Sequence, residues 1–162
     1  MNIEIINSKF VITDFDEFEA YRIGSKIEED GIYFYKNCLN RVTTAAAKEA
    51  IEFLIGEEKS HLKFFQDCLY ELRQEKDDAS EEDDLLTSID YGIFNLAFNP
   101  VKSSKKDQLF QIIAFAIEIE DRSIEFYQAV QASVKGPDVK VQLSRIVKEE
   151  TRHKAILKGL AI

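Results

Sequence analysis

The feature that most constrains the fold of this chain is an internal repeat, in which each residue of the second copy is numbered 92 higher than its partner. In both copies a Glu stands seven residues before a Tyr, and a later Glu-Glu-x-x-His follows. The chain has only two histidines, and both end such a motif. The repeated pairs are Glu28 with Glu120, Tyr35 with Tyr127, Glu58 with Glu150, and His61 with His153. A repeat of this kind predicts two copies of one structural unit.

Two prolines and six glycines in 162 residues leave few places where the chain must turn, which favours long helices over many short strands. Cap residues and apolar spacing predict four helices. They cover about residues 14–39, 44–75, 104–135 and 137–159. We therefore expect an all-α four-helix bundle, built from two helical hairpins related by the repeat and forming a single domain over residues 1–162.

Two segments do not fit the repeat. The stretch 76–104, which opens on an acidic run, is predicted to be a long crossover connection between the two hairpins. The first dozen residues contain Ile3, Ile5 and Ile6, and the pattern leaves open whether they are extended or form a short docking helix.

Composition excludes several classes of protein. A net charge of −9 without a basic stripe argues against nucleic acid as a partner. The longest apolar run without charge is Ile112–Ile117, so no membrane-spanning helix and no membrane partner are expected, and without a visible secretory leader the expected location is the cytoplasm. Cys38 and Cys68 are too few for a thiolate metal site, and we expect both to be buried small hydrophobes.

The repeated acids and histidines are candidate metal ligands. Residues three apart on a helix share a face, so Glu58 with His61, and Glu150 with His153, each aim one oxygen and one nitrogen in the same direction. Glu28 and Glu120 mark the inward faces of two other helices. Four buried carboxylates would repel one another and lose much solvation, and two divalent cations would balance their charge. An oxygen and nitrogen set without thiolate suits iron or manganese better than structural zinc.

The neighbours of these ligands have simpler predicted roles. Small residues flank the acids and could leave space between the helices: Gly24 and Gly31 in one copy, Ala116 and Ser123 in the other. Helix geometry rotates four adjacent acids away from the ligand face, and we expect them to be solvated: Glu29, Glu57, Asp121 and Glu149. Six aromatic residues are expected in the core: Phe34, Phe53, Phe64, Phe65, Phe115 and Phe126.

These motifs resemble the rubrerythrin branch of the ferritin-like superfamily over about residues 27–153. The resemblance implies a ferritin-like bundle that holds two iron ions, with manganese or zinc as alternatives. Glu58 and Glu150 would bridge the metals, Glu28 and Glu120 would be terminal ligands, and His61 and His153 would each bind one metal. Tyr35 and Tyr127 would donate hydrogen bonds to the carboxylates.

The chain departs from this family at two points. Rubrerythrins carry a four-cysteine rubredoxin-like iron domain that these 162 residues do not contain, so electrons are expected from a separate donor such as a rubredoxin-like protein. Rubrerythrins also have an additional glutamate three residues after the ligand of the third helix, where this chain has Ser123. The family's redox-linked iron movement, and with it efficient peroxide reduction, is therefore in question here.

The function expected from these observations is a di-iron oxidoreductase that reduces hydrogen peroxide or dioxygen, in a peroxidase-like or ferroxidase-like manner. No catalytic residue beyond the metal ligands is predicted. The alternatives are an iron-handling ferroxidase and a metal-binding bundle without catalysis. A homodimer is expected by analogy with related bundles.

Overall fold

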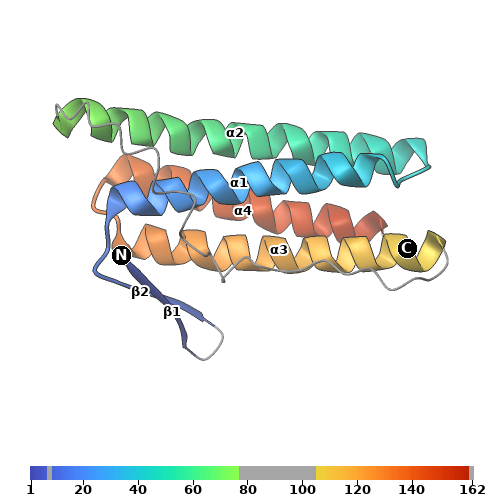
Figure 1. Ribbon diagram of the computed structural model, residues 1–162, viewed down its shortest axis with the longest axis horizontal. Helices are drawn as coiled ribbons and strands as arrows, with labels where there is room; N and C mark the ends of the chain where they lie inside the picture. Colours follow the sequence, from blue (N-terminus) through green and yellow to red (C-terminus); the bar gives the residue numbers. More distant parts are fainter. Residues whose placement is uncertain (7–8, 77–104, 161–162) are drawn as a thin grey trace.

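A computed structural model of the protein describes residues 1–6, 9–76 and 105–160, which form a small hairpin and four helices. The helices are α1 (Glu17–Leu39), α2 (Ala45–Lys76), α3 (Lys105–Ser133) and α4 (Pro137–Leu160). They lie side by side along the long axis of the molecule (Figure 1). The predicted all-α four-helix bundle is confirmed, and the predicted helix bounds agree to within two residues except at the start of α1, which begins at Glu17 rather than near residue 14.

Local chemistry explains where the helices begin. The side chain of Asp16 accepts a hydrogen bond from the backbone N–H of Glu19 at 2.7 Å, so Asp16 caps α1. The Thr44 hydroxyl accepts from the N–H of Ala47 at 3.2 Å at the start of α2. Helix α4 begins at Pro137, directly after Gly136, and proline suits this position because it lacks an N–H that the first turn could not use.

The four helices are arranged as two consecutive helical hairpins. Helices α1 and α2 pack against each other, and so do α3 and α4. Helices α2 and α3 run in the same direction, so α2 ends and α3 begins at opposite ends of the bundle (Figure 1). The predicted crossover, residues 76–104, lies outside the described residues apart from Lys76, the last residue of α2.

The amino terminus is extended, which answers the question that the sequence left open. Strands β1 (Asn2–Ile6) and β2 (Lys9–Thr13) pair antiparallel, with Ile3 opposite Ile12. Strand β2 packs against α3, where the ring of Phe10 meets that of Phe126 edge to face at 6.4 Å. The terminal amine also forms an ion pair with Glu19 at 2.6 Å. The hairpin therefore lies against the side of α3, near the end of the bundle at which α1 begins (Figure 1).

The apolar core has two parts, one toward each end of the bundle. The part near the hairpin includes Phe65, Phe126 and Leu143, all fully buried, and the other includes Leu54 and Leu157. Among the described residues, no helix has an apolar stretch long enough to cross a bilayer. Between the two apolar parts lies a belt of buried polar side chains.

Candidate metal centre

The polar belt consists of the six residues that the sequence predicts as metal ligands. The middle of each helix contributes to it: α1 and α3 give one Glu each, and α2 and α4 give one Glu and one His each. None of the six is more than 3% exposed. They are Glu28, Glu58, His61, Glu120, Glu150 and His153. The helix spacing thus brings together every residue of the predicted set.

The six side chains form two overlapping groups of four. Glu28, Glu58, His61 and Glu150 make the first group, which we call site 1. In the second group, site 2, Glu120 and His153 replace Glu28 and His61. The donor atoms within each group lie no more than 4.8 Å apart. Glu58 and Glu150 belong to both groups, which is the position that two bridging carboxylates would take.

Both imidazole rings turn the same nitrogen toward the carboxylates. His61 Nδ1 lies 3.0 Å from Glu150 and 3.5 Å from Glu58. His153 Nδ1 lies 2.8 Å from Glu150 and 3.3 Å from Glu58. The two rings are stacked, with 5.7 Å between their centroids. Each group therefore presents one nitrogen and three carboxylates to a common space.

The two tyrosines hydrogen-bond to Glu120 and Glu28, the two acids that each belong to one group only. Each bond joins one copy of the repeat to the other. Tyr35 on α1 donates its hydroxyl proton to Glu120 on α3, and Tyr127 on α3 donates to Glu28 on α1. Both tyrosines are almost fully buried, at 2% and 0% exposure. The structure thus places these hydroxyls on the carboxylates, as the resemblance to rubrerythrins implies.

Without a metal, burial favours the protonated form of Glu28 and Glu120, the two acids that each belong to one group only. Burial raises the pKa of Glu28 well above its usual value, and the neighbouring Glu58 carboxylate adds to this effect. Burial and the charge of Glu150 raise the pKa of Glu120 in the same way. Neutral carboxyl groups at these positions remove two of the four negative charges.

The histidines balance the remaining two charges. Although burial alone would lower the pKa of His153, the nearby carboxylates of Glu150 and Glu58 raise it to about 9. The pKa of His61 is raised further, because the nearby carboxylates of Glu150, Glu28 and Glu58 outweigh the effect of burial. These contacts also lower the pKa of Glu58 and of Glu150 in spite of their burial. In the metal-free belt these shifts favour imidazolium rings paired with the carboxylates of Glu58 and Glu150.

The donor set fits two divalent cations. Among the described residues, several buried donor atoms of the belt lack a hydrogen bond of good geometry: His61 Nδ1, Glu150 Oε2, His153 Nδ1 and His153 Nε2. Buried polar atoms are rarely left unpaired in proteins unless an ion or water satisfies them. Three of these four atoms face the space that each group of ligands shares. Four carboxylates and two neutral imidazoles would balance two divalent ions in charge and supply each with oxygen and nitrogen.

The predicted solvation of the adjacent acids is wrong for Glu149. Its side chain is 21% exposed and accepts hydrogen bonds from His61 Nε2 at 3.1 Å and from Arg145 Nε at 2.9 Å. A rotation of about 100° from Glu150 turns Glu149 toward α2 rather than toward water. The spacing of Arg145 and Glu149, four apart on one helix face, is the one sequence signal for this contact.

The other three acids differ in exposure. Glu29 is exposed, and Asp121 is half-exposed and pairs with Lys154. Glu57 is 26% exposed and lies 3.7 Å from Arg152. The guanidinium of Arg152 also covers the ring of Phe53 at 4.6 Å, and Phe53 is 36% exposed, so its predicted place in the core is wrong.

The small residues beside the acids do not leave open space along the bundle. A Cβ on Gly24 would lie 2.7 Å from the ring of Phe65, so this glycine allows the ring to pack against α1. A Cβ on Gly31 would be in ordinary contact with the Glu58 carboxylate at 3.8 Å. The Ser123 hydroxyl donates to the carbonyl of Ile119 in its own helix at 3.1 Å.

Neither cysteine belongs to the belt. Cys38 and Cys68 are both buried and free, and burial raises the pKa of each thiol to about 12. A thiol with this pKa is protonated at neutral pH and unreactive. Their predicted role as small buried hydrophobes is consistent with these environments.

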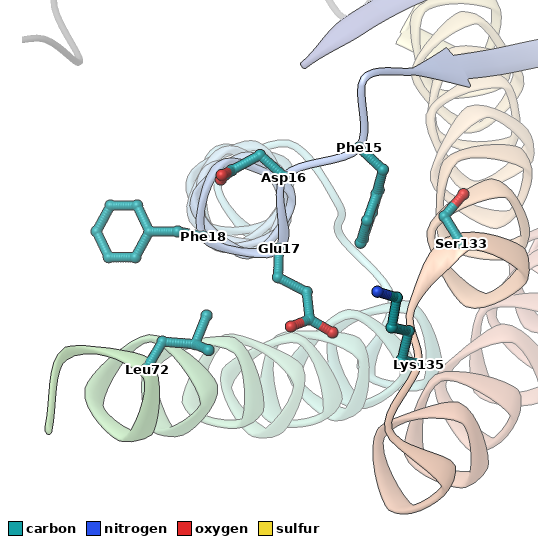
Figure 2. A pocket seen from close by; sticks show the side chains of 7 residues that line it. All are labelled: Phe15, Asp16, Glu17, Phe18, Leu72, Ser133 and Lys135. Atoms are coloured by element: carbon teal, nitrogen blue, oxygen red, sulfur yellow. The ribbon is translucent and has the colours of Figure 1, made fainter. Parts of the chain in front are cut away.

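An open pocket of about 280 Å³ lies at the end of the bundle where α1 begins. Figure 2 shows that its walls come from the start of α1 and the ends of α2 and α3. Its lining residues are Phe15, Asp16, Glu17, Phe18, Leu72, Ser133 and Lys135. None of them belongs to the polar belt, so the candidate chemistry lies inside the bundle and not in this pocket.

The comparisons with known proteins agree with this geometry. The family model described as Rubrerythrin matches residues 24–161, which include all six residues of the belt and both tyrosines. Searches of the curated proteins and of the solved structures found no match. Because the family model covers most of the chain, this protein belongs to the rubrerythrin family.

Proposed function

We propose that this protein is a di-iron oxidoreductase that reduces hydrogen peroxide or dioxygen with electrons from a separate protein. The observation that carries the proposal is the pair of overlapping ligand groups, which share Glu58 and Glu150 and lie wholly inside the bundle. Ligands shared in this way would hold two metal ions close together, so that each could supply one electron to a two-electron reduction.

The choice of iron rests on the donor set and on the family. Carboxylate and imidazole ligands without thiolate suit iron and manganese, and membership of the rubrerythrin family favours iron. Elemental analysis of the protein from its native host, combined with metal-edge anomalous scattering from crystals, tests this choice. Zinc alone at the site would contradict the redox proposal.

The residues of the belt have distinct tasks in this proposal. A bound ferrous pair supplies two electrons, which with two protons reduce one hydrogen peroxide to two waters. Tyr35 and Tyr127 keep Glu120 and Glu28 in place through their hydrogen bonds. The apolar core on both sides of the belt limits the access of bulk water to the site.

Turnover in this proposal requires an electron donor from outside the described residues. The two free cysteines are buried and separated, since Cys38 packs in one part of the core and Cys68 in the other. We therefore propose a separate donor, such as a rubredoxin-like protein, for the return of electrons. The homodimer expected from the sequence stays a prediction, which sedimentation analysis of the full chain would test.

The experiment is anaerobic loading with ferrous iron followed by one equivalent of hydrogen peroxide. The reduced protein is expected to consume the peroxide once and to need a donor for further turnover. A parallel reaction with dioxygen identifies the preferred oxidant. The Glu58→Gln variant, which loses a ligand shared by both groups, is the matched control and is expected to be inactive. A protein that binds two irons but leaves both oxidants unchanged would overturn the proposal.

A further inference from the structure

The two histidines of the belt differ in the contacts of Nε2, the ring nitrogen that lies opposite the Nδ1 atom facing the ligand groups. His61 Nε2 faces the Glu149 carboxylate at 3.1 Å, from α2 to α4 across the bundle. His153 Nε2 is buried and lacks a hydrogen-bond partner among the described residues. The internal repeat would lead one to expect the same contact at both rings, so this difference needs an explanation.

The explanation lies in two positions where the copies of the repeat differ. Glu57 is the repeat partner of Glu149, and it would be the counterpart for His153. Four residues before Glu149 stands Arg145, which forms an ion pair with it, whereas Phe53 occupies the matching place before Glu57. Glu149 is thereby held by a cation on its own helix, and Glu57 is not.

A second arginine is paired with Glu57. Arg152 on α4 lies 3.7 Å from the Glu57 carboxylate and covers the ring of Phe53. Ser60 occupies the matching position on α2, and its hydroxyl donates to the carbonyl of Gly56 at 3.2 Å. The α2 position that matches Arg152 therefore carries no cation that could draw Glu149 away from His61.

We propose that Glu149, held by Arg145, is a positioning residue that fixes the His61 ring with Nδ1 toward the metals, and that the two metal positions are inequivalent because His153 has no such partner. A carboxylate that accepts the outer N–H of a ligating histidine fixes its tautomer and raises its basicity, and removal of such a partner typically lowers metal affinity 10–100-fold. Site 1, with His61, is then the tighter position and site 2, with His153, the weaker.

This inference rests on the proposed metal centre, and the chain offers a matched pair of variants to test it. Glu149→Leu removes the acceptor with little change in size, Glu149→Gln keeps an acceptor without the charge, and Glu57→Leu makes the same change at the repeat partner. Circular dichroism of each metal-free variant checks the fold. Cobalt(II) is the probe, in titrations of the full chain against a competing chelator.

The wild-type chain is expected to bind two cobalt ions with different affinities. Glu149→Leu is expected to weaken the tighter position about 10–100-fold, Glu149→Gln to restore part of this loss, and Glu57→Leu to change neither position more than about twofold. In the paramagnetic NMR spectrum of the cobalt-loaded protein, Glu149→Leu should shift one of the two imidazole N–H resonances and Glu57→Leu neither.

Equal affinities in Glu149→Leu and the wild-type chain, or equal losses in Glu149→Leu and Glu57→Leu, would overturn the inference. Failure of the wild-type chain to bind two metal ions would instead overturn the metal centre itself, together with everything that rests on it. The two failures are thus distinguished before any activity is measured.

Discussion

The hydroxyl of Tyr127 on α3 donates a hydrogen bond to Glu28 on α1, although the glutamate seven residues before Tyr127 on its own helix is Glu120. Tyr35 on α1 makes the reciprocal bond to Glu120. Each copy of the repeat therefore supplies the donor that the other copy's acid requires. The two hairpins complete the centre only when they pack together, which couples formation of the site to formation of the bundle.

Replacement of Tyr127 by phenylalanine tests this coupling. The Tyr127→Phe variant leaves a fully buried carboxyl oxygen of Glu28 without its donor, and an unsatisfied buried polar group costs about 1–3 kcal/mol. We expect the free energy of unfolding of the metal-free protein to fall by about this amount. Urea denaturation measures it. Tyr33→Phe is the control, since Tyr33 is 71% exposed on α1. Equal stability of the two variants would show that the Tyr127 bond contributes nothing.

The overlap of the two ligand groups predicts different stoichiometries for two conservative variants. Glu58 lies in both groups, and Glu58→Gln removes its negative charge and leaves a single oxygen for two positions, so we expect both metal ions to be lost on desalting. Glu28 lies in site 1 alone, so Glu28→Gln should retain the ion at site 2. Elemental analysis of metal-loaded, desalted protein counts the ions. Loss of both ions from Glu28→Gln as well would argue against two separable positions.

Metal binding should release protons. In the metal-free belt burial and neighbouring charges raise the pKa of Glu28 and Glu120, and contacts with carboxylates raise the pKa of both histidines. Metal ions bind the deprotonated forms, so two divalent ions replace protons at up to four groups, and the belt keeps a near-neutral charge. The apparent affinity should therefore rise with pH through about 9, the pKa of His153, and continue to rise above it, because the pKa of His61 is higher still.

Calorimetric titration with manganese(II) in buffers of different ionisation enthalpy measures this release. The observed binding enthalpy should change with the buffer, in proportion to the number of protons released. An enthalpy independent of the buffer would mean that the ligands are already deprotonated in the metal-free protein. Glu57→Gln is a suitable control, because Glu57 lies outside both ligand groups.

The sequence predicts the belt well because its residues obey two simple periodicities. Glu58 and His61 are three apart on one helix and must point the same way, and the offset of 92 residues repeats that geometry. Local signals also place the helix ends, because Gly136 and Pro137 stand where α3 has ended and α4 begins.

Periodicity within one helix does not predict the contacts between helices. The sequence predicts Glu149 in water because it neighbours a ligand on its own helix. Its contact with His61 instead depends on how α2 and α4 approach each other. Phe53 was expected in the core for its apolar ring, yet it lies on the outer surface beneath Arg152. The sequence does not decide the amino-terminal strands, because a pair of short strands is stabilised by what it packs on, here α3, rather than by local propensity.

Two glycines within the helices give the last prediction, because their surroundings differ. A Cβ on Gly24 would come within 2.7–2.9 Å of the buried Phe65 ring, whereas a Cβ on Gly56 would meet nothing within 4 Å. Alanine gains about 1 kcal/mol over glycine inside a helix, while overpacking a core costs about 1–3 kcal/mol. Gly56→Ala should therefore stabilise the protein by about 0.5–1 kcal/mol and Gly24→Ala should destabilise it by up to about 2 kcal/mol. Denaturant unfolding of the metal-free variants measures both changes. Stabilisation by Gly24→Ala would mean that the Phe65 ring can move aside, and that α1 and α2 are less tightly packed beside the belt than their contact indicates.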